Sequence, residues 1–496
     1  MKSAKYLVLC VAVIALASCS GAAVMDKNLL TPEMASPEMA APEIANVRIA
    51  EEWSESQNNS KNASSDVGAV RNGWLDDLEM DGLSRFVDEV LVNNPDFRAT
   101  AHRLEASGYG AAISRADLWP TLEAGLGASR QRISNPSLTS NRLSLGFDAR
   151  WEADIWGRLS ARAAAADADY RVASADYAGA RLSLVAQVSQ AWFDVMEAQA
   201  QVNLAHKTVE SFERAVNIVE KRFSRGLSTG LDLRLIVSSS EASRASLSRR
   251  QDQLNRQKRS LEILAGRYPS ATILAAGTMP DLKADVPVGL PVNILERRPD
   301  LQSARARLLS AGYNSQAADK DLLPRFSITA SGNNSSSNFS DLLRFDNIFW
   351  TLVGNVTQPI FQGGKLRYAA KSQAALFAAE KQTFARILLA AFQEVEDALS
   401  SERSLKEQVR HTKIAAENAV AAENVALDQY SRGLIRISVL LESQRQSLAQ
   451  QSQLLSIRKQ RINNRIALHL ALGGDFTRQK DRLTQTGNDV AEGDRL

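Results

Sequence analysis

The chain has 496 residues, of which 44% are hydrophobic and 23% are charged, with 59 Lys and Arg against 56 Asp and Glu. This composition looks globular overall. The near balance of basic and acidic residues argues against a nucleic-acid partner, because such proteins usually carry a concentrated basic face.

Residues 1–18 are typical of a bacterial export signal. Lys2 and Lys5 precede an apolar run from Tyr6 to Leu16, which is too short to span a bilayer as a permanent helix. The run is followed by Ala17, Ser18 and Cys19. This small-residue segment ending in cysteine resembles a bacterial lipobox, in which the chain is cut before the cysteine and the thiol is acylated. A plain signal peptide with an incidental cysteine is the alternative.

Residues 19–73 are predicted to form an extended N-terminal tether. They contain few large apolar side chains and a five-residue reiteration at 32–36, 37–41 and 42–46. Such a segment cannot bury enough surface to offset the entropy lost on ordering. Residues 475–496 form a polar C-terminal tail, expected to fray. No apolar run of about 18 residues follows the signal, so no helical membrane anchor is predicted.

A β-hairpin with one apolar and one polar face is predicted within residues about 119–156. The first strand alternates from Pro120 to Ser129, and the alternation is nearly unbroken between Arg142 and Trp156. In the longer strand the apolar positions are Leu143, Leu145, Phe147, Ala149, Trp151, Ala153 and Ile155. A second hairpin is predicted at about 324–361, where Phe326, Ile328 and Ala330 alternate on one strand and Trp350, Leu352, Val356 and Ile360 lie on the other.

Strands of about ten residues that alternate in this way and are bordered by aromatic residues match transmembrane barrel strands. A soluble β-sandwich strand alternates equally well and is the alternative. Two hairpins cannot close a membrane barrel, because bilayer strands tolerate no free edge and single-chain barrels need about eight strands or more. Several chains are therefore expected to share one barrel. Two chains would give about eight strands, filled by their own side chains, so an open pore favours three chains and about twelve strands.

Long helices are predicted between the hairpins. Proline is absent from Ser137 to Tyr268 and after Pro359, and a continuous helix from Arg158 to Phe223 would measure roughly 100 Å. It carries an apolar seam at coiled-coil spacing: Leu184, Val188, Ala191, Val195, Ala198, Val202, Ala205, Val209, Phe212, Val216, Val219 and Phe223. Glycine-bearing turns at Gly226 and Gly433 are expected to end the long helices and let shorter helices return.

The chain is an internal tandem repeat. Residues 94–96 return at 298–300 and residues 117–120 at 321–324, at an offset of 204; beyond the hairpins, residues 223–227 return at 430–434, at an offset of 207. A net insertion of three residues in the second hairpin explains the change. We define copy one as residues 74–268, with a helical hairpin at about 158–266, and copy two as residues 292–474, with a helical hairpin at about 365–473. The linker is 269–291. Tandem copies suggest that each contributes the same part of a larger closed object.

The segment Pro287-Val288-Gly289-Leu290-Pro291, with Arg297-Arg298-Pro299-Asp300-Leu301 and Phe361-Gln362-Gly363-Gly364-Lys365, resembles the outer-membrane efflux protein family, the TolC-like channels, in its NodT or OprM-type lipoprotein branch. The resemblance covers about residues 74–474. It implies a mainly α fold with membrane β: a trimeric 12-stranded transmembrane β-barrel, four strands per chain, continuous with a long periplasmic α-helical coiled-coil tunnel. It also implies export of small toxic compounds delivered by an inner-membrane pump of the RND type through a periplasmic adaptor.

The resemblance assigns roles to the helix tips. Leu440-Leu441-Glu442-Ser443-Gln444-Arg445 is similar to the family segment whose acid and arginine restrain the closed periplasmic mouth, so Glu442 and Arg445 are gate candidates. Leu231-Asp232-Leu233-Arg234 resembles the neighbouring run, which adds Asp232 and Arg234. Val439 departs from relatives that have another acid there. The expected adaptor contacts are the tip residues Phe223, Gly226, Leu227, Tyr430, Gly433 and Leu434, and Cys19 is the expected lipidation site in the outer membrane.

No enzyme, cofactor or metal site is predicted. The four histidines, His102, His206, His411 and His469, lack ligand spacing, and Gly363-Gly364-Lys365 lacks the rest of a phosphate-binding loop. Glu442 and Arg445 lie three residues apart, so they also suit an ordinary solvated pair. Two other functions stay open: an outer-membrane channel for type I protein secretion, and an envelope-spanning structural lipoprotein without a pore.

Overall fold

The structure is a computed structural model that describes residues 53, 73–75, 78, 80–134, 137–275, 277–282, 291, 294–344, 346 and 348–474. All of them belong to one unit, Arg48–Leu496. The predicted signal, Cys19 and the tail at 475–496 lie outside the described residues, as do the tether apart from Trp53 and Gly73 and much of the linker.

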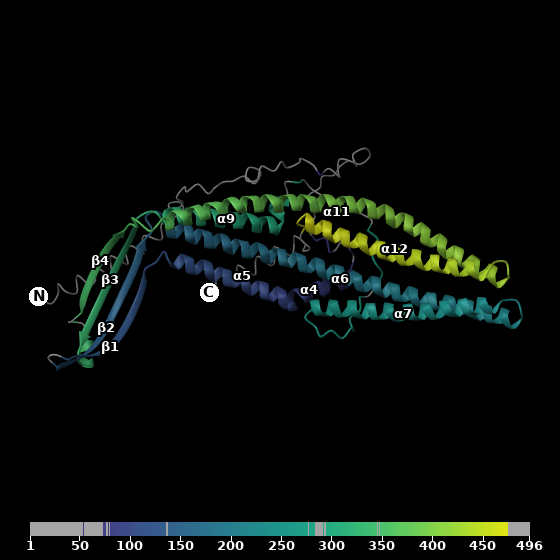
Figure 1. The fold of residues 1–496 in the computed structure, drawn as a ribbon, viewed down its shortest axis with the longest axis horizontal. Helices are drawn as coiled ribbons and strands as arrows, with labels where there is room; N and C mark the ends of the chain where they lie inside the picture. The colour runs from purple at the N-terminus through teal and green to yellow at the C-terminus, as the bar shows by residue number, and fades with distance from the viewer. Residues whose placement is uncertain are drawn as a thin grey trace. The chain divides into compact units, whose positions relative to one another are not determined.

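The described part of the chain is mostly helical, with one small sheet (Figure 1). Copy one contains α4 (Asp81–Asn93), α5 (Pro95–Ala116), β1 (Thr121–Ser134), β2 (Ser137–Ala153), α6 (Arg158–Ser224) and α7 (Gly230–Leu264). Copy two contains α8 (Ile294–Arg297), α9 (Pro299–Lys320), β3 (Arg325–Ser336), α10 (Phe339–Leu342), β4 (Phe349–Thr357), α11 (Lys365–Ser431) and α12 (Ile437–Ala471).

Corresponding helices have equal lengths in the two copies. α5 and α9 have 22 residues each, α6 and α11 have 67, and α7 and α12 have 35. The continuous helix expected from Arg158 to Phe223 is α6. It starts after Gly157, whose φ of 71° is left-handed, and Gly364 precedes α11 in the same region at 83°. A glycine suits both corners because a side chain would strain this backbone.

The four strands form one antiparallel sheet in the order β1-β2-β3-β4. Thr121 pairs with Arg150, 29 residues later, whereas the corresponding Arg325 pairs with Thr357, 32 residues later. The three extra residues therefore lie in the second hairpin, whose connection contains the short helix α10. The residue pattern did not predict α10. β4 also ends at Thr357, before Ile360, which the second hairpin was expected to include.

The expected seam on α6 forms the core of the helical region. Of its twelve positions, those from Leu184 to Val219 are buried except Ala191 and Val216, which are half-buried, and Phe223 at the end is exposed. α4 packs on the middle of α6, where Phe86 and Trp192 lie in ring contact at 5.4 Å. A separate apolar cluster near the turns joins Phe212 and Val219 of α6, Ile236 of α7 and Leu440 of α12.

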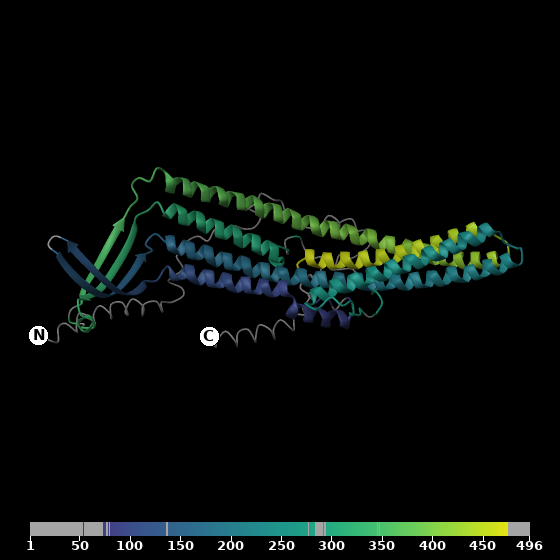
Figure 2. The ribbon, with the colours of Figure 1, turned by 60° about the horizontal axis from the view of Figure 1, so that its bottom comes forward.

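The sheet lies at one end of α5, α6, α9 and α11, and the turns that join α6 to α7 and α11 to α12 lie at the far ends of α6 and α11 (Figures 1 and 2). Among the described residues, no helix is both long enough and apolar enough to cross a bilayer.

Candidate functional site

The turn between α6 and α7, here called tip one (residues 222–232), is built by backbone hydrogen bonds. Leu227 N donates to Arg222 O at 2.8 Å and Gly226 N to Phe223 O at 2.9 Å. Together with a φ of 72° at Gly226, these bonds form a Schellman motif, which satisfies carbonyls at the end of the helix. The predicted glycine turn is thus a helix stop with a defined geometry.

The start of α7 is capped by side chains. Asp232 N donates to Thr229 Oγ1 at 3.1 Å, and the Asp232 carboxylate accepts from Thr229 N at 3.0 Å, which is a capping box. Ser228 Oγ also donates to this carboxylate. Partial burial raises the pKa of Asp232, but the hydrogen bonds from Thr229 and Ser228 and the charge of Arg222 hold it below its usual value. Asp232 is therefore ionised and engaged at its own helix start.

The turn between α11 and α12, here called tip two (residues 429–439), repeats the Schellman motif. Leu434 N donates to Gln429 O at 2.9 Å, and Gly433 has a φ of 79°. The cap of α12 differs, because Arg436 stands at the N-cap and forms no side-chain cap. Tip two therefore lacks the side-chain bonds that fix the start of the returning helix in tip one.

Arg222 joins the two tips, a role that sequence analysis missed. Its guanidinium donates to Leu227 O of tip one and to Ser431 O of tip two, each at 3.2 Å. Its Cζ lies 5.3 Å from the ring centroid of Tyr430, within cation–π range. Tyr430 is only 3% exposed. Among the predicted tip contacts, Tyr430 thus packs between the two hairpins, whereas Phe223, Leu227 and Leu434 are exposed.

Glu442 and Arg445 form an ion pair on the surface of α12. Arg445 Nη2 donates to Glu442 Oε2 at 2.7 Å, and the side chains of Arg445 and Glu442 are 70% and 65% exposed respectively. An exposed pair of this kind contributes under about 1 kcal/mol to stability. Within the described residues of one chain, no hydrogen bond or ion pair connects this pair with Asp232 or Arg234, which is also exposed.

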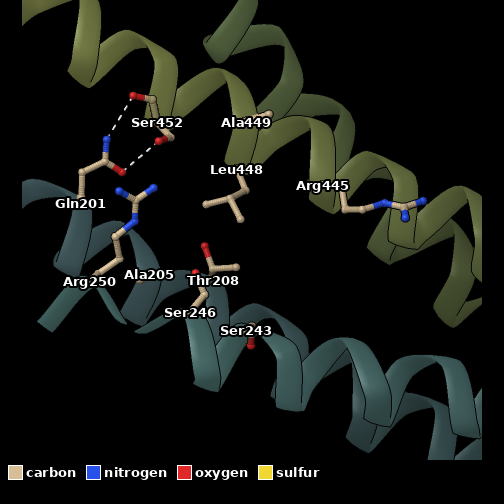
Figure 3. Close-up of a pocket in the computed structure, with 10 residues that line it drawn as sticks. All are labelled: Gln201, Ala205, Thr208, Ser243, Ser246, Arg250, Arg445, Leu448, Ala449 and Ser452. Carbon is tan, nitrogen blue, oxygen red and sulfur yellow. Dashed lines mark hydrogen bonds between the residues drawn. The ribbon is translucent and has the colours of Figure 1, made fainter. Parts of the chain in front are cut away.

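The pair borders two cavities. Glu442 lines one of about 460 Å³ between α11 and α12, beside Val439. Arg445 lies at one end of another, of about 270 Å³, between α12 and the pair α6 and α7 (Figure 3). At the other end, Gln201 accepts from Ser452 Oγ at 2.9 Å. Polar contacts therefore line part of the interface between the first helical hairpin and α12.

The four histidines lie far from the tips or on exposed helix surfaces. His469 is buried and stacks on Trp74 with ring centroids 5.6 Å apart. His102 and His411 each lie near a glutamate on the same helix. In the described part of the chain, no group of His, Cys, Asp and Glu side chains is arranged to hold a metal ion.

Several curated proteins are similar over most of the chain. The cation efflux system protein CusC of Escherichia coli O6:H1 is 28% identical over 442 residues, which is 86% of this chain and 93% of that protein. The probable efflux pump outer membrane protein TtgC of Pseudomonas putida is 28% identical over 449 residues, covering 88% and 92%.

Solved channels share the fold. The outer-membrane channel OprN superposes with a TM-score of 0.80 at 22% identity, covering 86% of this chain and 97% of that one. The open state of the MtrE outer membrane channel of Neisseria gonorrhoeae gives 0.76 at 25% identity, covering 88% and 97%. The family model for outer membrane efflux proteins matches residues 86–267 and 290–474, one segment for each copy and well over half of the chain. The chain therefore belongs to the outer membrane efflux protein family, whose members are channels of the outer membrane.

Proposed function

We propose that this protein is a passive export duct: a homotrimer whose strands form one twelve-stranded barrel in the outer membrane and whose helices form a periplasmic tunnel. The observation that carries the proposal is the sheet with unpaired β1 and β4 edges at one end of paired long helices. Within a bilayer such edges must be paired, because lipid offers no hydrogen-bond partners. Three chains supply enough strands to close a barrel with an open lumen.

The cargo is a class of small toxic compounds chosen by an inner-membrane pump of the RND type, not by this channel. The relatives support this division, since proteins with similar identity to this chain are named for cation efflux, toluene efflux and antibiotic efflux. One channel architecture thus accompanies chemically unrelated cargo. A wide lumen has little means of discriminating among small solutes, so selection belongs to the pump.

The exposed tips, with Phe223, Gly226, Leu227, Gly433 and Leu434, dock the helical tips of a periplasmic adaptor. Tyr430 supports this surface from beneath through Arg222. At the mouth of the tunnel, Glu442 and Arg445 restrain the closed state, with Asp232 and Arg234 beside them. The lipid attached to Cys19 holds monomers at the membrane before the trimer closes. Metabolic fatty-acid labelling tests whether the lipid is attached to Cys19, because Cys19→Ser should abolish incorporation.

Single-channel recording in planar bilayers tests the duct. Purified wild-type trimer should show discrete conductance, whereas a structural lipoprotein without a pore would show none. Deletion of the gene should sensitise cells to small toxic compounds. Loss of a secreted protein from the medium with unchanged sensitivity would instead favour type I secretion.

A further inference from the structure

We propose that Arg130 and Arg132 of β1 form a binding site for the phosphate groups of an outer-leaflet lipid, on the outward face of the sheet. The outward face is the one on which the apolar side chains of the four strands lie. The inference rests on the proposed barrel, in which this face contacts the membrane and the opposite face lines the lumen. The ligand is thus a lipid of the membrane, distinct from the cargo that crosses the lumen.

The strand pairing shows which side chains share the outward face. Arg130 and Arg132 lie two and four residues beyond Ala128 on β1, and Ala128 pairs with Leu143 of β2. Side chains two residues apart on a strand point to the same face, and directly opposed residues of paired strands share a face. Both arginines therefore lie on the face that also carries the apolar side chains Leu122, Leu126, Leu145, Phe147 and Trp151.

The arginines stand where the apolar band of this face ends. On β2 the outward positions are apolar from Ala153 to Leu143, and the next one is Asn141, which pairs with Arg130. At about 3.4 Å per residue and a tilt of about 40°, this stretch covers about 26 Å across the membrane, close to the height of the apolar band of a barrel. This end of the sheet is the one farther from the helices (Figure 1). Because the helices extend into the periplasm, Arg130 lies at the headgroups of the outer leaflet.

The outward face carries no carboxylate that could balance these charges. Among the described side chains of the four strands, Arg130 and Arg132 are its only charged groups, whereas the lumen face carries both signs, with Glu123, Asp148 and Arg142 among them. Both outward arginines are exposed, and neither forms an ion pair with a described residue. Two unpaired cations side by side attract an anion.

Copy two shows the corresponding position satisfied within the chain. Adding 204 to Arg130 gives Asn334 of β3. Asn334 Nδ2 donates to the carbonyl oxygens of Asp341, Leu342 and Arg344 at 3.2, 2.7 and 3.1 Å, and the residue is only 5% exposed. In copy one the same position holds a longer, charged side chain with no such partner in the described part of the chain. Its donors are therefore free for a ligand.

The connection that Asn334 holds supplies an apolar flank for acyl chains. Asn334 lies on the outward face because it pairs with Leu145, so α10 is held against that face. Leu342 of α10 is 2% exposed, whereas Phe339 and Leu343 are 60% and 56% exposed. Only β2 separates β1 from β3, so the arginines and the flank lie on strands roughly 10 Å apart. One lipid with several chains spans that interval.

Phosphate is the anion that the arginine pair fits best. Residues two apart on a strand lie about 7 Å apart, so both guanidinium groups can contact one phosphate or two neighbouring ones. Guanidinium binds phosphate oxygens through paired hydrogen bonds, which are stronger than those of neutral donors. A lipid with more than one phosphate and several acyl chains uses both arginines and the apolar flank. The proposed ligand is therefore a phosphorylated glycolipid of the outer leaflet.

Native mass spectrometry of the full-length trimer in detergent tests the site. The probe is lipid A with two phosphates, compared with the same lipid after both phosphates are removed. Wild type should bind the phosphorylated lipid about tenfold more tightly, since charged hydrogen bonds distinguish the two. Arg130→Gln with Arg132→Gln should abolish this preference. Arg130→Lys with Arg132→Lys should keep part of it, because the charges remain and the paired hydrogen bonds are lost.

Arg142→Gln is the matched control for Arg130→Gln. Arg142 pairs with Ser129, the neighbour of Arg130, but its side chain lies on the lumen face. Each change removes one cation at nearly the same height, and only Arg130→Gln should weaken binding of the phosphorylated lipid. Equal weakening by the two changes, or equal binding of the two lipids by wild type, overturns the site. Displacement of the lipid by an equal concentration of inorganic phosphate would overturn the lipid assignment.

Conductance of the same preparations separates this inference from the proposed function. A trimer that conducts but shows no preference for the phosphorylated lipid overturns the lipid site and leaves the export duct standing. A trimer that binds the lipid as expected but conducts nothing overturns the proposed function alone.

Discussion

In the first helical hairpin, Val195 of α6 and Leu254 of α7 are 1% and 2% exposed and belong to the same apolar core. At the corresponding positions of the second hairpin, 207 residues later, stand Glu402 of α11 and Arg461 of α12. The guanidinium of Arg461 donates to Glu402 Oε1 at 3.1 and 3.0 Å, and Arg465 donates to the same oxygen at 2.6 Å. At this one level, therefore, the helices of copy one meet through apolar side chains and those of copy two meet through an ion pair.

The difference shows that the same arrangement of two helices accommodates either a buried apolar contact or a largely buried ion pair. The two contacts should differ in how much stability a single substitution removes. Trimming an apolar side chain loses buried surface and leaves a cavity. Removing one member of a largely buried ion pair leaves a buried charge without a partner, which lowers the free energy of unfolding by more. Replacing the whole pair by apolar residues is often neutral. Copy two should therefore be more vulnerable to single substitutions than copy one.

The largest effect is expected for Glu402→Ala. It should lower the free energy of unfolding by about 3–5 kcal/mol, because Arg461 and Arg465 lose a shared acceptor. Val195→Ala, the matched change in copy one, should cost roughly 2 kcal/mol. Denaturant unfolding in detergent, followed by far-ultraviolet circular dichroism, measures both.

The double variant Glu402→Val with Arg461→Leu sharpens the same test, since it gives copy two the residues of copy one. It should recover the part of the lost stability that belongs to Arg461, because Arg465 still lacks Glu402 as its acceptor. If Glu402→Ala lowers the free energy of unfolding less than Val195→Ala does, the prediction that the ion pair makes copy two more sensitive to substitution is wrong.

The next largest effect is expected when the pH is lowered. It concerns His469 of copy two, which corresponds in position to Glu262 of copy one. Burial and the charge of Arg465 lower the pKa of His469 to about 4, although Glu402 acts in the opposite direction. His469 therefore binds a proton near pH 6.5 in the unfolded chain but only near pH 4 in the folded chain. The free energy of unfolding should fall by roughly 3 kcal/mol as pH drops through this window. Melting temperatures of wild type and His469→Gln between pH 7.5 and 4 measure it, and the variant should show a flatter profile.

Glu262 provides the contrast. Burial raises the pKa of its carboxyl, but hydrogen bonds from Ala271, Ile273 and Thr272 hold it below its usual value of 4.5. Its stabilisation is thus present above pH 4.5 and is lost only in stronger acid. Between pH 6.5 and 4.5, Glu262→Gln should lower stability without changing the slope. A profile for His469→Gln that runs parallel to wild type through the same window would contradict the assignment to His469.

A smaller effect is expected at the tips. Thr229→Ala removes the N-cap of α7 and should cost about 1 kcal/mol, with faster hydrogen exchange confined to the start of that helix. Arg436→Thr with Val439→Asp transfers the capping box to α12 and should stabilise its start by a similar amount. Hydrogen exchange measured by mass spectrometry distinguishes the start of α7 from the start of α12. Equal exchange at the starts of α7 and α12 in wild type would show that the cap difference has no energetic consequence.

The smallest effect on stability, but a large one on conduction, is expected for Glu442→Ala with Arg445→Ala. Each exposed pair contributes under about 1 kcal/mol, yet three copies acting together can shift the open population by orders of magnitude. Resting conductance and sensitivity to vancomycin should rise. The matched control is Glu407→Ala with Arg410→Ala, another exposed pair three residues apart, on α11. Equal conductance in the two variants would reduce Glu442 and Arg445 to surface charges.

The sequence alone predicted the features that depend on neighbouring residues. Apolar spacing along α6 predicted its buried face, and the lack of proline predicted its continuity, since both act within a few turns of one helix. Gly226 and Gly433 predicted helix ends because a left-handed residue is a local backbone requirement. Matching landmarks along the chain also predicted corresponding elements, and α6 and α11 have equal lengths.

Only the tertiary structure decided the contacts between distant segments. Arg222 bonds to Ser431, 209 residues away, and no local pattern indicates which carbonyl it reaches. The sequence does not show that Glu402 lies beside Arg461 and Arg465, or that Trp74 stacks on His469. The physical reason is that hydrophobic period reports which face of an element is buried. The identity of the side chain that meets a buried charge depends on how separate helices are aligned in space, which periodicity does not encode.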